Sequence, residues 1–231
     1  MPSSPAPVLH YIFDPLCGWC YAAAPLLAAA RALPGLAVQW HAGGMLSGAA
    51  RRTITREWRA HVIPHDERIA ALTGQPFGDA YYNGLLNQVG ATLDSTPPIA
   101  AMLAAEAMDG RGLDLLARAQ TAHYVEGQQI STLGVLQSLA GELGLDIRTF
   151  TAHCQEVLAD TVQSHIQESR EWLQASGGQG FPTFVLEFTD RSSGQRVAQR
   201  VDIGPWLGNP AGWAEHLQQG LERAAGALPR D

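Results

Sequence analysis

The sequence predicts an α/β fold in which a βαβ unit and a later ββα unit share one mixed sheet, with a large all-helical insertion between them. Two observations lead to this prediction. Segments rich in β-branched and aromatic residues occur only near the two ends, at 8–13, 36–41 and 181–203. The stretch between them, from about residue 47 to residue 176, shows helical periodicity broken by Gly and Pro and no alternating segment.

The first unit reads as strand, helix, strand. The apolar run Val8–Phe13 ends at Asp14-Pro15, as a buried strand closed by a turn would. An Ala- and Leu-rich helix is expected over 21–33, kinked at Pro25 because proline has no amide hydrogen and crowds the preceding turn. A second strand is expected at 36–41, before two glycines interrupt it.

The insertion contains three apolar stripes at spacings of three and four residues, each typical of a helix packed on one face. The stripes are Ile99, Met102, Leu103 and Ala107; Ile130, Leu133, Leu136, Leu139 and Leu143; and Leu158, Val162, Ile166, Ser169 and Leu173. Part of this insertion is expected to overhang the functional site and to limit the size of the substrate.

The second unit reads as hairpin and helix. The run 181–188 and the alternating residues from Val197 to Ile203 form two strands around a turn at 190–194. The last helix starts at Asn209-Pro210, with Asn as the N-cap and Pro in the first helical position. The predicted domains are therefore 1–46 with 177–231, and the inserted 47–176.

Composition excludes several classes of function. The formal net charge is −7, and all 15 basic residues are arginines with only Arg51 and Arg52 adjacent, so the clustered basic face of a nucleic-acid binder is missing. Without lysine, a phosphate-binding GxxxxGK[ST] loop cannot exist. No apolar stretch is long enough to span a membrane, and residues 1–7 lack the features of a signal peptide, so we expect a cytoplasmic protein.

Three cysteines are too few for a disulfide scaffold in a chain of this size. Cys17 and Cys20 form a CxxC motif between a strand and a helix, where unpaired amides and the helix dipole stabilise a thiolate at the first cysteine. In a reducing compartment, CxxC is either a redox dithiol or half of a metal site. Zinc would need two more ligands, for which His41, His153 and Cys154 are only scattered candidates, so we favour the dithiol and expect no metal.

The segment Cys17-Gly18-Trp19-Cys20, the proline eight residues after Cys17, and Gly180-Phe181-Pro182-Thr183 opening a distant strand together resemble the thioredoxin superfamily. The helical block between the two halves resembles the DsbA family. The segment Phe13–Tyr21 is similar to the FrnE-like, cytoplasmic protein-disulfide isomerases of that family. The resemblance covers essentially the whole chain and implies a thioredoxin-like fold and disulfide exchange.

This resemblance also implies the roles of individual residues. Cys17 would attack a disulfide and Cys20 would resolve the mixed disulfide. The Phe181–Pro182 bond would be cis and would present backbone to an extended substrate, beside Trp19. The substrate-binding set is then Gly18, Trp19, Phe181, Pro182 and Thr183.

One position departs from the family pattern. Many members carry a buried carboxylate six residues before the first cysteine, where this chain has Tyr11. The proton of Cys20 would then pass to water, to Asp14 or to His10. The Gly-Trp spacer matches neither the reducing nor the strongly oxidising members, so the direction of electron flow stays open.

Two other functions stay open at this point. The chain could be a glutathione-dependent transferase or isomerase resembling the kappa class, although a serine normally replaces the first cysteine there. It could also be a metal- or partner-binding module without catalysis. The dithiol reading predicts no cofactor beyond the redox disulfide, with glutathione as a candidate co-substrate. Its partners would be disulfide-containing proteins or small-molecule thiols, with a reducing partner that the sequence does not identify; it allows a homodimer, with no nucleic acid and no membrane.

Overall fold

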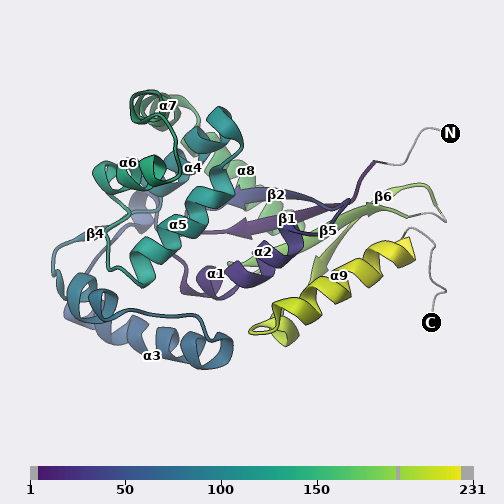
Figure 1. Ribbon diagram of the computed structural model, residues 1–231, viewed down its shortest axis with the longest axis horizontal. Helices are drawn as coiled ribbons and strands as arrows, with labels where there is room; N and C mark the ends of the chain where they lie inside the picture. The colour runs from purple at the N-terminus through teal and green to yellow at the C-terminus, as the bar shows by residue number, and fades with distance from the viewer. Residues whose placement is uncertain (1–4, 191–192, 225–231) are drawn as a thin grey trace.

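The computed structural model describes residues 5–190 and 193–224 and places helices on both faces of a four-stranded mixed sheet (Figure 1). The strand order is β2–β1–β5–β6. Strand β1 runs parallel to β2 and antiparallel to β5, and β5 runs antiparallel to β6. The bounds are β1 Val8–Phe13, β2 Ala37–Ala42, β5 Thr183–Thr189 and β6 Arg196–Val201. The predicted arrangement of βαβ and ββα units around a mixed sheet is therefore confirmed.

The predicted helix over 21–33 is two helices, α1 Gly18–Ala22 and α2 Ala24–Arg31, separated at Ala23. Pro25 stands in the first turn of α2, where its missing amide hydrogen is harmless. A continuous helix would need that hydrogen to bond to the carbonyl of Tyr21. The proline thus ends one helix and starts the next, instead of kinking a single one.

Helix α9 (Pro210–Ala224) packs against α2 on one face of the sheet, and α8 (Val162–Ala175) covers the other face (Figure 1). Alternation along β1 divides its side chains between the two faces. Tyr11 lies on the α9 side, 4.8 Å from Phe184 between ring centroids, and Phe184 contacts Trp213 of α9. His10 lies on the α8 side, with its ring 4.2 Å from that of Trp172.

The start of α9 follows its sequence signal. The side chain of Asn209 accepts a hydrogen bond from the amide of Gly212 over 3.0 Å, and Pro210 is the first helical residue. The predicted turn at 190–194 includes residues 191–192, which lie outside the described residues, as do residues 1–4 and 225–231 of the predicted domain.

The segment between β2 and β5 is mainly helical. Its first long helix, α3 (Arg56–Thr73), begins at Thr55, whose hydroxyl accepts a hydrogen bond from the amide of Trp58 over 3.1 Å. The other helices are α4 Thr96–Asp109, α5 Gly112–Tyr124, α6 Leu133–Glu142, α7 Ile147–Asp160 and the sheet-covering α8. Short helical turns occupy Gly48–Ala50, Ala80–Gly84, Leu85–Asn87 and, after β6, Gly204–Trp206.

Two details of this segment differ from the prediction. A two-stranded ladder joins β3 (Arg52–Thr53) to β4 (Thr92–Leu93), although no strand was expected there. Strands of two residues are too short to show alternation, so the pattern cannot reveal them. The predicted stripe from Leu158 to Leu173 is also divided, because α7 ends at Asp160 and leaves Leu158 38% exposed.

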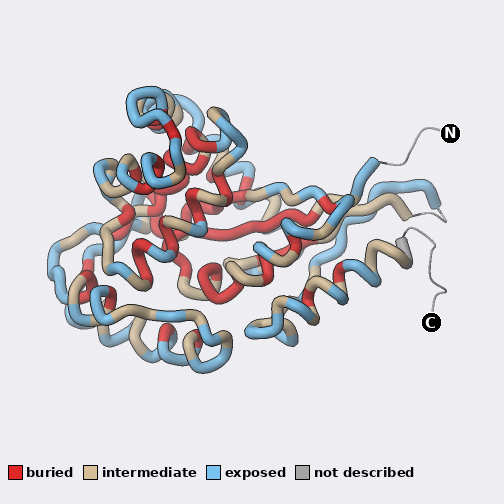
Figure 2. The backbone as a smooth tube through the Cα atoms, viewed as in Figure 1, coloured by how far each residue is buried: buried red, intermediate tan, exposed pale blue. Residues whose placement is uncertain are grey.

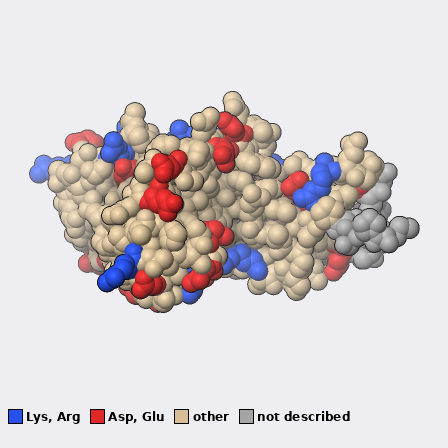
Figure 3. Space-filling model, turned by 90° about the horizontal axis from the view of Figure 1, so that it is seen from above, with Lys and Arg blue, Asp and Glu red and all other residues tan. Residues whose placement is uncertain are grey.

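Buried residues form two clusters, one centred on the sheet and one in the helical segment (Figure 2). Met45, in the loop after β2, is partly buried and packs against both the sheet core and the insertion core. On the face shown in Figure 3, acidic and basic groups are scattered in small groups over a largely uncharged surface. Among the described residues, no helix has both the length and the hydrophobicity that crossing a membrane requires.

Candidate active site

Cys17 lies at the junction of the β1 loop and α1. It is the N-cap residue of α1, with extended backbone, and its carbonyl accepts the first hydrogen bonds of that helix. Its side chain is 6% exposed, and its thiol donates to the carbonyl oxygen of Phe181 over 3.6 Å. The Phe181–Pro182 bond is cis. Cys17 therefore lies directly beside the loop that the family resemblance assigns to the substrate.

Cys20 lies one turn further into α1 and is fully buried. Both cysteines are free thiols, and a hydrogen bond links their side chains. Burial raises the pKa of Cys20 well above its usual value, and the hydrogen bond to Cys17 and the charge of Cys17 raise it further. The two thiols are thus unequal, since Cys20 is fully buried and held protonated while Cys17 contacts the loop at Phe181.

Asp14 is a fully buried carboxyl at the start of the same loop. Its Oδ1 atom accepts hydrogen bonds from the amide of Leu16 and the hydroxyl of Ser95, each over 2.9 Å, and its Oδ2 atom accepts one from the amide of Met45 over 2.5 Å. Burial raises the pKa of Asp14 to about 6, against the opposing effect of these donors and of the charge of Arg170. The amide of Asp14 also donates to the sulfur of Cys20 over 3.5 Å.

Tyr11, at the position of the family carboxylate, is fully buried behind α1. Its hydroxyl donates to the carbonyl oxygen of Cys20 over 3.3 Å. Burial, with the charges of both thiols, raises the pKa of Tyr11 well above its usual value. Tyr11 therefore stays neutral and supplies a hydrogen bond where the family pattern has a charge.

The structure does not bring His10 to the dithiol. It lies on the α8 side of the sheet, whereas Cys20 and Tyr11 lie on the other side. Its two ring nitrogens are engaged there, 3.0 Å from Nε2 of His41 and 3.1 Å from a carboxylate oxygen of Glu187. Of the two candidates for proton transfer, only Asp14 is placed next to Cys20.

The loop that contains Phe181 and Pro182 is held by the turn after β2. A Cβ atom at Gly43 would collide with the ring of Phe181, so the ring packs directly on the glycine backbone. Arg170 of α8 donates to the carbonyl oxygens of Gly43 and Gly44, each over 2.7 Å. The hydroxyl of Thr183 donates to the carbonyl oxygen of Gly180 over 2.8 Å and closes the other end of the loop.

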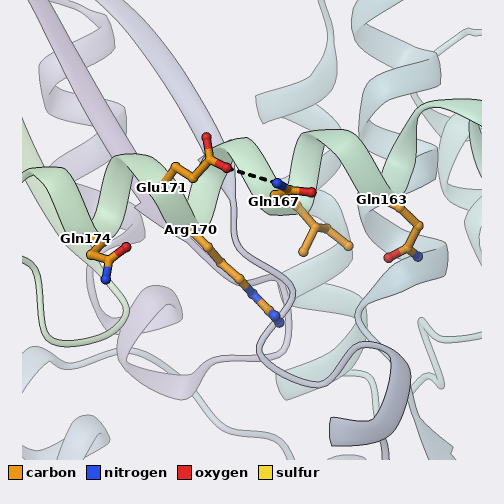
Figure 4. A pocket seen from close by; sticks show the side chains of 6 residues that line it. Gln163, Gln167, Arg170, Glu171 and Gln174 are labelled. Atoms are coloured by element: carbon orange, nitrogen blue, oxygen red, sulfur yellow. Dashed lines mark hydrogen bonds between the residues drawn. The ribbon is translucent and has the colours of Figure 1, made fainter.

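A shallow groove of about 390 Å³ runs along α8 beside this turn (Figure 4). Arg170 extends from α8 toward the turn, while Glu171 accepts a hydrogen bond from Gln167 over 3.0 Å on the outer side. The groove is lined by Gln163, Ile166, Gln167, Arg170, Glu171 and Gln174.

The two spacer residues of the motif face the helical insertion. Trp19 is partly buried, and the guanidinium carbon of Arg68 on α3 lies 5.9 Å from its ring centroid, a cation–π distance. An ideal Cβ at Gly18 would lie 3.0 Å from Oδ1 of Asp66 and 3.1 Å from Cδ1 of Ile69, both on α3. The insertion therefore touches the CxxC motif itself.

Several of these neighbours were not predicted from the sequence. Ser95, Arg170, Arg68 and Asp66 lie between 46 and 150 residues after Cys20 and belong to no recognisable pattern. Each reaches the site through helix packing, and a lone charged residue on an amphipathic helix normally indicates a solvated face.

Other candidate ligands do not gather into a metal centre. His61 and His65, one turn apart on α3, have rings 5.1 Å apart. No group of three or more His, Cys, Asp or Glu side chains able to hold a metal ion occurs within 5–190 and 193–224. Cys154 is 1% exposed in α7, and burial raises its pKa to about 12, which keeps it an unreactive thiol near neutral pH.

Comparisons with known proteins agree with this geometry. A family model described as a DSBA-like thioredoxin domain matches residues 8–202. No curated protein matches the sequence. Among solved structures, the cytosolic disulfide reductase DsbM from Pseudomonas aeruginosa with GSH is 44% identical with a TM-score of 0.84, covering 93% of this chain and 99% of that one.

Two further structures are similar over nearly their whole length. A second structure, described as the cytosolic disulfide reductase DsbM from Pseudomonas aeruginosa, is 45% identical with a TM-score of 0.85, covering 94% of this chain and 99% of that one. A protein from Nitrosomonas europaea, described as a putative protein disulfide isomerase, is 25% identical with a TM-score of 0.75, covering 94% and 98%.

Proposed function

The chain belongs to the DsbA-like thioredoxin domain family, and we propose that it is a cytosolic disulfide reductase that uses Cys17 to attack and Cys20 to resolve. The observation that carries the proposal is the unequal pair of thiols. Cys17 lies against the carbonyl of Phe181, while Cys20 is fully buried and protonated. The reducing direction is supported by the 44% identity to a protein described as a cytosolic disulfide reductase.

The reaction begins when the Cys17 thiolate attacks one sulfur of a substrate disulfide. The substrate S–S bond breaks, one substrate sulfur leaves with the electron pair and takes up a proton, and Cys17 becomes part of a mixed disulfide. Cys20 then attacks the sulfur of Cys17 and releases the second substrate thiol. The substrate gains two electrons and two protons, and Cys17 and Cys20 are left joined by a disulfide.

Formation of the mixed disulfide activates Cys20. The charge of Cys17 and the hydrogen bond between the thiols, which both raise the pKa of Cys20, disappear once Cys17 is bonded to the substrate. Asp14, whose amide contacts the Cys20 sulfur and whose pKa of about 6 leaves it ionised at neutral pH, is the proposed acceptor of the Cys20 proton. It takes the part that the carboxylate at the position of Tyr11 plays in other members.

The structural neighbour with GSH supports glutathione as the electron donor. One glutathione thiolate would attack the Cys17–Cys20 disulfide, and a second would release the first as glutathione disulfide, returning both cysteines to thiols. The substrate would be a protein or small-molecule disulfide, held beside Trp19, Phe181 and Pro182.

The test is a reduction potential together with trapping of the mixed disulfide. The purified protein is equilibrated in glutathione redox buffers, and the state of the cysteines is read after thiol trapping and mass spectrometry. We expect a potential near about −270 mV, like that of thioredoxin; a value near about −120 mV would instead indicate an oxidant. The Cys154→Ser variant, which changes only the buried cysteine of α7, is the matched control and should give the wild-type potential.

The single-cysteine variants separate the roles. Cys20→Ser should accumulate a glutathione adduct on Cys17, whereas Cys17→Ser should form no adduct and no longer reduce disulfides. If glutathione conjugation to an electrophile continues in Cys20→Ser, the kappa-class reading replaces the reductase. If wild-type protein forms no Cys17–Cys20 disulfide in any buffer, disulfide exchange is not its function.

A further inference from the structure

A buried carboxyl of the insertion lies against the spacer of the CxxC motif. Asp66, on α3, is 4% exposed, and its Oδ1 atom lies 3.0 Å from where a Cβ of Gly18 would be. Gly18 immediately follows Cys17 and is the first residue of α1. The space between α1 and α3 thus accommodates only the hydrogen atom of a glycine at position 18. A larger side chain there would displace Asp66 or Ile69.

The carboxyl is held in place. The hydroxyl of Tyr81, which is 3% exposed, donates to Oδ2 of Asp66 over 2.8 Å. A small cavity of about 50 Å³ lies beside the pair, large enough for about one or two water molecules. It is lined by Leu16, Gly18, Trp58, Val62, Asp66, Tyr81, Leu86, Leu93, His123 and Tyr124.

Asp66 and the two thiols act on a common neighbour. Tyr124 is fully buried, and after burial itself and the charge of Tyr81, the charges of Asp66, Cys17 and Cys20 each raise its pKa. Bulk solvent screens a charge on Asp66 only weakly from the thiols, because Asp66, Cys17 and Cys20 are all buried.

We infer that Asp66 is a positioning residue whose negative charge shifts the Cys17–Cys20 pair toward the disulfide. Tyr81 holds this charge beside Gly18. The inference rests on the proposed disulfide exchange. A carboxylate near Cys17 opposes the thiolate but acts only weakly on the neutral disulfide. The charge thus disfavours the reduced state and makes the pair a stronger reductant. Through the charge of Asp66, the insertion would set the direction of electron flow, although it contributes no cysteine to the site.

Ionisation of Asp66 provides a signature that a merely structural role would lack. Burial raises the pKa of Asp66 to about 6, so the carboxyl is mostly neutral at pH 5 and charged at pH 7.5. Three tyrosines and one histidine around Asp66 stay in one form over this range. The pKa values of Tyr81, Tyr82 and Tyr124 are raised, that of Tyr82 to about 12, and that of His123 is lowered to about 4.

Asp14, on the α1 side, ionises in the same range as Asp66. It is unchanged in the variants that follow, so a difference between wild type and variant isolates Asp66. Glu67 and Arg68 are the exposed charged neighbours on α3 itself, and Arg59 of the same helix donates to the carbonyl of Tyr82.

The experiment measures the equilibrium between dithiol and disulfide in glutathione buffers at pH 5 and pH 7.5 for wild type, Asp66→Asn and Glu67→Gln. We expect Asp66→Asn to favour the dithiol about tenfold more than wild type at pH 7.5, equivalent to about 30 mV for a two-electron couple, and to match wild type at pH 5. Glu67→Gln, which removes an exposed carboxylate one residue away, should match wild type at both values.

Two results would overturn the inference. One is an equilibrium for Asp66→Asn equal to that of wild type at pH 7.5, and the other is a shift of the same size at both pH values, which indicates altered packing. If Asp66→Asn does not fold, Tyr81→Phe decides instead. This variant keeps the carboxyl of Asp66 and removes its hydrogen-bond donor, so the pKa of Asp66 should rise. The reduction potential should then begin to respond to the charge of Asp66 at a higher pH than in wild type. An unchanged profile refutes the proposal. Failure of the proposed function would appear differently, as a wild-type protein that forms no disulfide at all.

Discussion

The amide of Asp14 donates to the sulfur of Cys20 over 3.5 Å, while the carboxyl of the same residue accepts hydrogen bonds from three donors. Two of these donors, Met45 and Ser95, come from the loop after β2 and from the residue preceding α4. One buried residue therefore ties the resolving thiol to both halves of the molecule, and its ionisation should affect both reactivity and stability.

The first prediction concerns catalysis by Asp14. Asp14→Asn removes the proposed acceptor of the Cys20 proton and leaves the attack by Cys17 possible. The mixed disulfide should accumulate, with resolution slowed by about 100-fold, a typical contribution of a positioned base. Acid-quenched time courses would measure the two steps separately. Ser95→Ala, which removes a donor but keeps the carboxyl, should slow resolution much less, and equal slowing in both variants would argue for a structural role of Asp14.

The second prediction concerns the pH dependence of stability. The pKa of Asp14 is about 6 in the folded protein and lower when unfolded, so the folded state binds the proton more tightly. The stabilisation from this proton is complete below about pH 4 and is lost as the pH rises through about 6. Asp14→Asn never ionises at this position, so its free energy of unfolding relative to wild type should increase by about 2 kcal/mol from pH 4 to pH 7.

Thermal or urea unfolding of both proteins across this pH range would measure the difference. His41, His123 and His165, whose pKa values are lowered to about 4, act in the opposite sense, because their stabilisation is lost as the pH falls from about 6.5 through 4. They are present in both proteins and cancel in the comparison. A difference independent of pH would show that the Asp14 carboxyl does not change its ionisation there.

The third prediction concerns the packing of Phe181 on Gly43. A methyl group in Gly43→Ala must displace the Phe181 ring and with it the carbonyl that faces Cys17. Disulfide reduction should fall by about tenfold or more, because small errors in position are costly in catalysis. The reactivity of Cys17 toward iodoacetamide, which needs no substrate loop, should change little.

Gly134→Ala is the matched control, since no atom lies within 4 Å of a Cβ at this helical glycine. It should keep full activity and gain slight stability. Full activity of Gly43→Ala would mean that the position of the Phe181 loop does not limit the reaction.

The fourth prediction concerns Arg170. Arg170→Met removes two hydrogen bonds to the turn at Gly43 and Gly44 and should lower the free energy of unfolding by about 1–2 kcal/mol, allowing for the exposure of this side chain. Because the charge of Arg170 also lowers the pKa of Asp14, that pKa should rise in the variant. Urea unfolding and the pH profile of resolution would measure the two effects.

Gln167→Ala, on the same helix, loses only a surface contact to Glu171 and should leave both measurements unchanged. A stable Arg170→Met variant with a wild-type pH profile would show that the turn does not depend on this side chain.

The order of elements, the dithiol and the cis-proline loop could be predicted from the sequence because each has a local signal. Strand β1 was predicted with its observed bounds from one apolar run ended by Asp14-Pro15. Pro25 marked a break in the active-site helix, although the local pattern did not show that two separate helices would form. The short strands β3 and β4 left no signal, because two residues cannot display alternation.

The charges around the thiols were decided only by the tertiary structure. His10 and Asp14 were both candidates for proton transfer in the sequence. Alternation along β1 turns His10 to the face covered by α8, while Asp14 lies in the loop after β1, beside Cys20. Asp66 stands 49 positions after Cys17 and reaches Gly18 only through the packing of α3 on α1. Residue type and local spacing thus sufficed to predict the two sulfur atoms of the proposed exchange. The carboxyls proposed to control the exchange could be found only in the folded chain, since electrostatic interaction depends on distance and burial, and these follow from how the helices pack.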